Sequence, residues 1–170
     1  VVFTFTQGCD IQGGQADTGD SYAFLNITSS YITHNGLSYR DQGVTTKRER
    51  GYAARHGKYV TFRDCFINGL DDHYGHHYVI DNCDFLHRGI GYCGGPLTVT
   101  NCRQHALTAS LVELRTDTPY ADGDLIIRDS FANAILLGLT SANNSAYSTK
   151  YKAWDNILID NCEVNQGASH

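Results

Sequence analysis

The chain has 170 residues, 41% hydrophobic and only 18% charged, which excludes a disordered polyelectrolyte and favours one compact unit. A formal net charge of -5 argues against nucleic acid as a partner, because a general nucleic-acid binder needs a basic face. No apolar run approaches the ~20 residues of a membrane span, so no membrane partner is expected. The chain lacks methionine and opens on the strand-like Val1-Val2-Phe3, and we interpret it as a fragment of a longer chain.

One short pattern recurs along the chain: two apolar residues at alternate positions, then a polar pair, then a small closing residue. In chain order it occupies 3–9 (with one inserted residue), 25–30, 60–65, 78–83, 97–102, 125–130 and 157–162. The alternation predicts strands whose apolar side chains face inward. The Asn or Asp before most of the closing residues is typical of a tight turn, since both tolerate a left-handed backbone.

The closing residues of the pattern lie between 18 and 35 positions apart. A coil of 18 to 21 residues with insertions at its turns predicts an all-β fold, a right-handed single-stranded parallel β-helix, with strands stacked ~4.8 Å apart. We expect residues 1–170 to form one such solenoid domain of about seven coils with uncapped ends. The alternative, unrelated hairpin strands of a β-sandwich, does not explain why Asn-Cys or Asp-Cys recurs at one phase. The shared phase predicts that five apolar pairs align, inward-facing, on one parallel sheet: Val60/Phe62, Tyr78/Ile80, Leu97/Val99, Leu125/Ile127 and Ile157/Ile159.

The cysteines follow the same repeat. Of the six, only Cys93 falls outside the closing position, and a column of small residues in a core suits free cysteine. We therefore expect six free thiols. No CxxC pair is present, so neither a zinc site nor a cofactor is expected.

The repeat series from Tyr59 to about Asn165 resembles the pectate-lyase-like β-helix superfamily, which includes polysaccharide lyases, some glycoside hydrolases, epimerases and bacteriophage tailspikes. Asp71-Asp72-His73-Tyr74-Gly75 and Glu113-Leu114-Arg115-Thr116-Asp117 are similar to signatures of bacterial and phage β-helix proteins that act on, or attach to, polysaccharide. The full calcium and arginine set of pectate lyases is absent. The resemblance implies a polysaccharide substrate or receptor, a homotrimer and a place on the virion tail.

Ionisable residues gather over three consecutive coils. Counting from the closing cysteines places Gly89-Ile90-Gly91-Tyr92 beside Asp71-Asp72-His73-Tyr74, and the following coil contributes Leu111 to Arg115. If Ile90 and Leu114 face inward, the predicted catalytic residues face outward around a groove floored by Gly89 and Gly91. These residues are Asp71, His73, Glu113 and Arg115.

The chemistry of this groove has two versions. Asp71 and Glu113, two coils apart in one column, would lie ~9–10 Å apart by strand stacking, near the ~9.5 Å limit for inverting glycosidases. A lyase would instead use His73 or a tyrosine as base and Arg115 or Arg88 as the cation. The alternative is a solvated ladder of ion pairs with no chemistry.

Substrate-binding residues are expected around the groove. The segment 115–123 reads as a protruding loop, and tyrosines can stack on sugar rings. The predicted binding residues are Tyr74, Arg88, Tyr92, Asp117 and Tyr120. A metal site through His73, His76 and His77 is the less favoured interpretation, because no ligand spacing singles it out and His76 and His77 are expected to enter the next strand.

The leading hypothesis is a phage tailspike-like domain that cleaves a bacterial surface polysaccharide as a lyase or glycoside hydrolase. The second is a non-catalytic β-helix for virion structure, receptor binding or adhesion. The third is a secreted bacterial polysaccharide lyase or epimerase. The sequence leaves open which glycan is bound.

Overall fold

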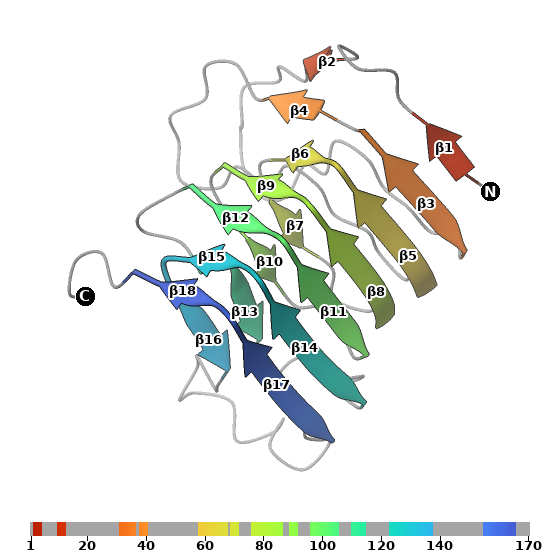
Figure 1. Ribbon diagram of the computed structural model, residues 1–170. Helices are drawn as coiled ribbons and strands as arrows, with labels where there is room; N and C mark the ends of the chain where they lie inside the picture. Colours follow the sequence, from red (N-terminus) through yellow and green to blue (C-terminus); the bar gives the residue numbers. More distant parts are fainter. Residues whose placement is uncertain are drawn as a thin grey trace, which may run out of the picture.

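The computed structural model of the chain is all-β (Figure 1). It describes residues 2–4, 10–12, 31–36, 38–40, 58–67, 69–71, 76–86, 89–91, 96–105, 110–114, 123–137 and 155–165. Strands alone form the regular structure of these ranges, without a helix. Consequently the described part of the chain holds no helix that could span a membrane.

Three sheets run along the molecule, and every strand pairing within them is parallel. The first sheet has seven strands in the order of the chain: β1 (Val2–Thr4), β3 (Ile32–Asn35), β5 (Lys58–Arg63), β8 (His76–Asp81), β11 (Leu97–Thr100), β14 (Asp124–Arg128) and β17 (Asn156–Asp160).

The second sheet has seven short strands: β2 (Asp10–Gln12), β4 (Ser38–Arg40), β6 (Phe66–Ile67), β9 (Asp84–Phe85), β12 (Arg103–Gln104), β15 (Phe131–Ala132) and β18 (Glu163–Val164). The third sheet has four: β7 (Leu70–Asp71), β10 (Ile90–Gly91), β13 (Val112–Leu114) and β16 (Ile135–Leu137). From β5 to β16 the chain passes through the first, second and third sheets in turn, and we call each pass a round. The described residues of the rounds that begin with β1, β3 and β17 contribute strands to the first two sheets. The round β5-β6-β7 thus stacks on β8-β9-β10 (Figure 1).

The predicted alignment of apolar pairs in the first sheet is confirmed. Val60 pairs with Tyr78, Tyr78 with Leu97 and Leu97 with Leu125, and the second members of these pairs align in the same way. All eight residues are buried. Strand alternation therefore sends one apolar side chain of each pair after another into a continuous core.

The fifth apolar pair has the predicted register but is not buried, so the prediction is wrong in that part. Ile157 and Ile159 keep the register with Leu125 and Ile127, but they are 50% and 43% exposed. The reason is position: β17 ends its sheet, and no described strand stacks beyond it. Register follows from the repeat, whereas burial also needs a neighbour on both sides.

The repeat predicted at 25–30 is not the neighbour of β5 in the first sheet. The strand that precedes β5 in the first sheet is β3, in which Ile32 pairs with Val60 and His34 with Phe62. The segment 25–30 lies outside the described residues. Buried His34 takes the place of an apolar residue and stacks on the ring of Phe62, with 5.0 Å between ring centroids. A search for apolar pairs therefore overlooks this strand.

Each strand of the first sheet from β5 onward is followed directly by a left-handed residue, as the polar pair predicts. The φ angles lie between 48° and 54° at Asp64, Asn82, Asn101, Asp129 and Asn161. Gly36, which follows β3, has φ 72° at the same place. Asparagine, aspartate and glycine tolerate this conformation better than other residues. The turn carries the chain from the first sheet into the second.

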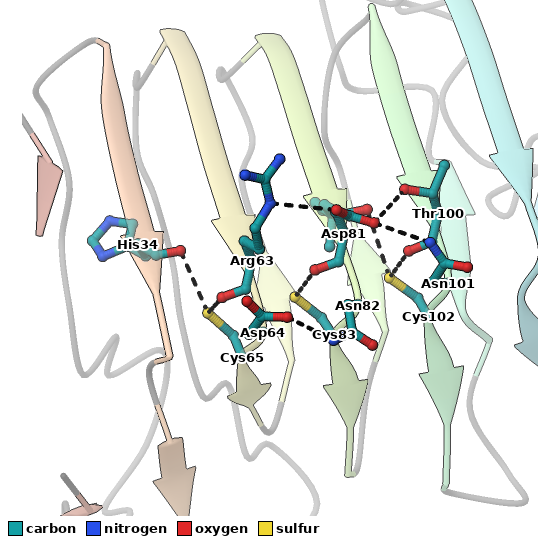
Figure 2. Close-up of polar contacts among 11 residues, drawn as sticks. His34, Arg63, Asp64, Cys65, Asp81, Asn82, Cys83, Thr100, Asn101 and Cys102 are labelled. Atoms are coloured by element: carbon teal, nitrogen blue, oxygen red, sulfur yellow. Dashed lines mark hydrogen bonds and ion pairs between the residues drawn. The ribbon is translucent and has the colours of Figure 1, made fainter. Parts of the chain in front are cut away.

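The closing cysteines form a column inside this turn (Figure 2). Cys65, Cys83, Cys102 and Cys162 are free thiols, and the first three are buried. Each thiol donates a hydrogen bond to the carbonyl two residues before it, at 3.1 to 3.3 Å. The prediction of free thiols is confirmed for these four, whereas Cys9 and Cys93 lie outside the described residues.

Candidate functional site

The third sheet places two acidic residues in one row. Asp71 on β7 pairs with Gly91 on β10, and Gly91 pairs with Glu113 on β13. The residues before them, Leu70 and Val112, are buried. Asp71 and Glu113 are thus two strands apart, with a residue that has no side chain between them.

The register between β7 and β10 differs from the one predicted. Counting from the cysteines placed Gly89 beside Asp71, but the structure pairs Gly91 with Asp71. The cause is loop length: residues 68–69 connect β6 to β7, whereas residues 86–89 connect β9 to β10. A shift of two residues preserves the alternation of faces, so it changes the neighbours without exchanging the faces.

Gly89 does not floor an exposed groove, contrary to the prediction. It is buried, and a Cβ there would lie 2.0 Å from the carbonyl oxygen of Leu111 and 2.3 Å from that of Ser110. The Gly89 carbonyl itself accepts a hydrogen bond from the Leu70 amide at 3.0 Å. This glycine lets three backbones of neighbouring rounds come close together, so its role is structural.

Most of the remaining predicted site lies outside the described residues. This holds for catalytic His73 and Arg115, for the side chains of Asp71 and Glu113, and for the predicted binding residues Tyr74, Arg88, Tyr92, Asp117 and Tyr120. Of the predicted catalytic residues, the structure therefore brings together the backbone positions of Asp71 and Glu113.

A row of aromatic side chains stands where the chain enters the first sheet. The rings of Tyr31 and Tyr59 are stacked, with 4.7 Å between centroids and 6° between planes, and the ring of His77 follows 4.4 Å from Tyr59. Tyr31 is 68% exposed and Tyr59 41%. All three have left-handed backbones, with φ between 56° and 60°. The row therefore marks a second corner of the round, at which side chains of consecutive rounds stack.

His76 belongs to the same corner. Its Nδ1 atom lies 2.6 Å from Nδ1 of His77, and the two ring centroids are 4.8 Å apart. The Tyr59 ring packs edge-on against His76 at 6.2 Å. Both histidines lie on β8, as expected. Among the described residues there is no group of three or more His, Cys, Asp or Glu side chains arranged to hold a metal, and His73 lies outside them.

A polar network lies at the carboxyl ends of the first-sheet strands β5, β8 and β11 (Figure 2). The Asp81 carboxylate accepts hydrogen bonds from Thr100 at 2.8 Å and from Asn101 at 3.2 Å, and Arg63 Nε lies 3.3 Å from it. These hydrogen bonds, aided by the Arg63 charge, lower the pKa of Asp81 below its usual value. Its partners come from the rounds before and after its own, so the network supports the stacking of the strands.

The second sheet carries an exposed acid–imidazole pair. His105 Nε2 lies 2.6 Å from a carboxylate oxygen of Asp84. Beside it, the Arg103 guanidinium lies 5.2 Å from the ring centroid of Phe131. The His105 and Asp84 side chains are 41% and 46% exposed and come from neighbouring rounds, so the pair suits a surface contact between rounds.

Sequence reasoning missed the aromatic corner, although a signal was present. Tyr59 and His77 each come directly before the first apolar residue of a repeat, and Tyr31 directly precedes Ile32. Aligning the repeats one position further upstream shows the row. The assignment of the earlier repeat to 25–30 concealed Tyr31.

Comparisons with known proteins return no relatives: no protein-family model, no curated protein and no solved structure matches this chain.

Proposed function

We propose that this chain is a right-handed single-stranded parallel β-helix that binds a bacterial surface polysaccharide and cleaves it with the carboxyl groups of Asp71 and Glu113. The observation that carries the proposal is the row Asp71–Gly91–Glu113 on the third sheet. The parallel pairing of every round supports the β-helix, and parallel connections in a sheet are almost always right-handed.

The spacing of the row suits acid–base cleavage of a glycosidic bond. Two strand spacings separate the backbones of Asp71 and Glu113 by ~9.6 Å, and inverting glycosidases hold their carboxyl groups ~6.5–9.5 Å apart. One carboxyl group protonates the leaving oxygen while the other activates a water molecule. Glycine at position 91 keeps the space between them clear of a side chain.

Alternation along the strand favours the same assignment. Because Leu70 and Val112 are buried in the core, the following positions, 71 and 113, are expected on the opposite face of the sheet. His73 and Arg115 follow Asp71 and Glu113 by two residues in the sequence, so we propose them as further catalytic groups. Elimination rather than hydrolysis would use His73 as base and Arg115 to neutralise the uronate carboxylate.

The setting of the reaction follows from the family resemblance. We propose a bacteriophage tailspike-like protein on the virion tail that acts as a homotrimer on capsule or O-antigen. Tyr74, Arg88, Tyr92, Asp117 and Tyr120 are its proposed substrate-binding residues. A secreted bacterial lyase or epimerase, and a non-catalytic receptor-binding or adhesion domain, are the alternatives that the experiment below separates.

The test incubates the protein with a panel of bacterial capsules and O-antigens and follows two products. New reducing ends without ultraviolet absorbance of an unsaturated uronate indicate hydrolysis, and both together indicate elimination. Asp71→Asn and Glu113→Gln should each abolish cleavage while leaving the melting temperature unchanged. Glu163→Gln, an exposed acid on β18, is the matched control and should keep full activity. Unchanged turnover in Asp71→Asn and Glu113→Gln would end the catalytic assignment.

A further inference from the structure

Two adjacent residues of one strand, His76 and His77, direct their rings toward each other. Successive side chains of a regular strand point to opposite faces, so neighbours in sequence do not normally meet. His77 departs from that rule because its φ is 60°, in the left-handed region. The turn brings Nδ1 of one ring within 2.6 Å of Nδ1 of the other.

The neighbouring rings hold this arrangement in place. Tyr59 packs on His77 with 4.4 Å between centroids and on His76 at 6.2 Å, and Tyr31 stacks on the other side of Tyr59. Both histidines are partly buried, so they are open to small solutes but restricted in rotation. The pair is therefore preorganised, which lowers the entropic cost of binding a ligand between the rings.

We propose that His76 and His77 form a two-imidazole site for a divalent transition-metal ion, with Cu²⁺ and Zn²⁺ as the ions it takes best. Imidazole nitrogen suits copper, nickel and zinc, and the general order of affinities favours Cu²⁺. Water completes the coordination. The site is separate from the proposed carboxylate pair and would exist whether or not the protein cleaves polysaccharide.

The geometry needs only a small adjustment to accept the ion. Histidine nitrogen binds zinc at ~2.0–2.1 Å, so two ligands of a tetrahedral zinc site lie ~3.3 Å apart, and two neighbouring ligands of a square Cu²⁺ site with similar bond lengths lie ~2.9 Å apart. The two Nδ1 atoms, now 2.6 Å apart, must therefore separate by ~0.3 Å for Cu²⁺ and by ~0.7 Å for Zn²⁺. In the neutral pair one Nδ1 carries the hydrogen that joins the rings. Binding moves that hydrogen to Nε2 of the same ring by exchange with water, so both Nδ1 lone pairs reach the metal and no net proton is released.

Binding is tested on the whole chain by calorimetric titration with Cu²⁺ and Zn²⁺ at neutral pH, with electron paramagnetic resonance of the Cu²⁺ complex. The variants are His76→Gln and His77→Asn, the second chosen because asparagine tolerates the left-handed backbone. Each should weaken Cu²⁺ binding about ten-fold or more, which is the loss of 1.4 kcal/mol or more. His105→Gln removes an exposed histidine elsewhere and should bind as the unaltered protein does.

The spectrum supplies a readout that does not depend on any variant. The unaltered protein should show hyperfine splitting from two imidazole nitrogens, and metal should raise its melting temperature because the folded state holds the two rings together and so binds more tightly than the unfolded chain. Circular dichroism without metal checks that both variants fold. Splitting from one nitrogen, or affinity unchanged in either folded variant, would overturn the site. A loss of Cu²⁺ binding in His73→Gln, with binding kept in His76→Gln and His77→Asn, would likewise overturn the site.

Discussion

The side-chain amide of Asn82 donates a 2.6 Å hydrogen bond to the carboxylate of Asp64, which occupies the same corner one round earlier. Asn161 repeats the contact with Asp129 at the same distance. Both members of each pair have left-handed backbones. The corner thus combines a strained conformation with a side-chain bond between rounds, and asparagine serves both needs.

Replacing Asn82 separates these two contributions. In Asn82→Ala the hydrogen bond is lost. Alanine must also adopt the left-handed backbone without a polar side chain that can bond locally, and this conformation costs ~1–2 kcal/mol per residue. Asn82→Gly loses the bond but adopts φ 52° without strain. We expect alanine to lower the free energy of unfolding by ~1–2 kcal/mol and glycine by clearly less, as measured by urea denaturation. Equal losses would show that backbone strain plays no part.

The repeat predicts the first sheet well because strand alternation and the closing turn are both local. Val60, Tyr78 and Leu97 align as expected for that reason. The third sheet is less predictable, since its register depends on how many residues each connection holds. Residues 86–89 contain two more than residues 68–69, and this difference moved Gly91 into the place assigned to Gly89.

Other features depend on packing that no repeat encodes. Buried His34 replaces an apolar residue, and its stacking on Phe62 depends on a contact between rounds. The meeting of His76 with His77 arises from one backbone angle. Neither follows from a pattern of apolar residues, because histidine is compatible with the surface and with the core.

Gly89 offers a test of the close approach between rounds. A methyl group there would lie 2.0 Å from the Leu111 carbonyl oxygen, a backbone atom that cannot rotate away. Overpacking a buried position typically costs ~1–3 kcal/mol. We expect Gly89→Ala to lie at or beyond the upper end of that range, because the clash is with backbone atoms. The comparison is Gly123→Ala, whose Cβ meets the side chain of Pro96 at 2.9 Å, although its φ of 94° also strains it. Thermal unfolding should rank Gly89→Ala below Gly123→Ala, and the reverse order would contradict the packing seen at Gly89.

The cysteine column should tolerate serine better than its burial suggests. Ser130 already occupies the closing position and donates a 2.6 Å hydrogen bond to the Arg128 carbonyl, just as Cys102 donates to Thr100. Cys102→Ser keeps this hydrogen bond, whereas Cys102→Val leaves it unmade, so the valine variant should be less stable than the serine variant by ~0.5–1.5 kcal/mol, the usual net contribution of one hydrogen bond. Chemical denaturation compares the two.

The same column predicts slow thiol chemistry. Cys65, Cys83 and Cys102 are buried, and hydrogen bonding with Cys102, together with burial, raises the pKa of Cys83 well above its usual value. The thiolate is the reactive form, so these three thiols should react with an aromatic disulfide reagent only when the protein unfolds. Rapid native labelling of Cys83, located by peptide mass spectrometry, would contradict the buried column.

His34 should make the fold sensitive to mild acid. Burial lowers the pKa of its imidazole from 6.5 to about 4, so the unfolded chain takes up a proton that the folded chain refuses. Stability linked to this group is complete above pH 6.5 and falls as the pH drops from there to about 4. Asp81, whose pKa is lowered, also loses stability on acidification, but only below its ordinary value of 3.8. His34→Phe introduces the same ring as its neighbour Phe62. It should flatten the fall in the free energy of unfolding between pH 6.5 and about 4, as followed by urea unfolding at a series of pH values. An unchanged slope would rule out His34 as its source.

Gly91 provides the most selective test of the carboxylate row. It pairs with Asp71 on one side and Glu113 on the other, so a side chain at 91 stands between the two proposed catalytic groups. Gly91→Leu should therefore block cleavage while both carboxyl groups remain, and Gly91→Ala should have an intermediate effect because its methyl group fills less of the gap. The control, Thr98→Leu, introduces the same leucine side chain on β11, which lies in the first sheet and not in the third, and it should leave turnover unchanged.

The measurement is the rate of release of reducing ends from the glycan that the panel identifies, with melting temperatures recorded for all three variants. A steric block predicts loss graded by side-chain size at constant stability. If Gly91→Leu cleaves at the unaltered rate, the substrate does not pass between Asp71 and Glu113, and the row is only part of the sheet.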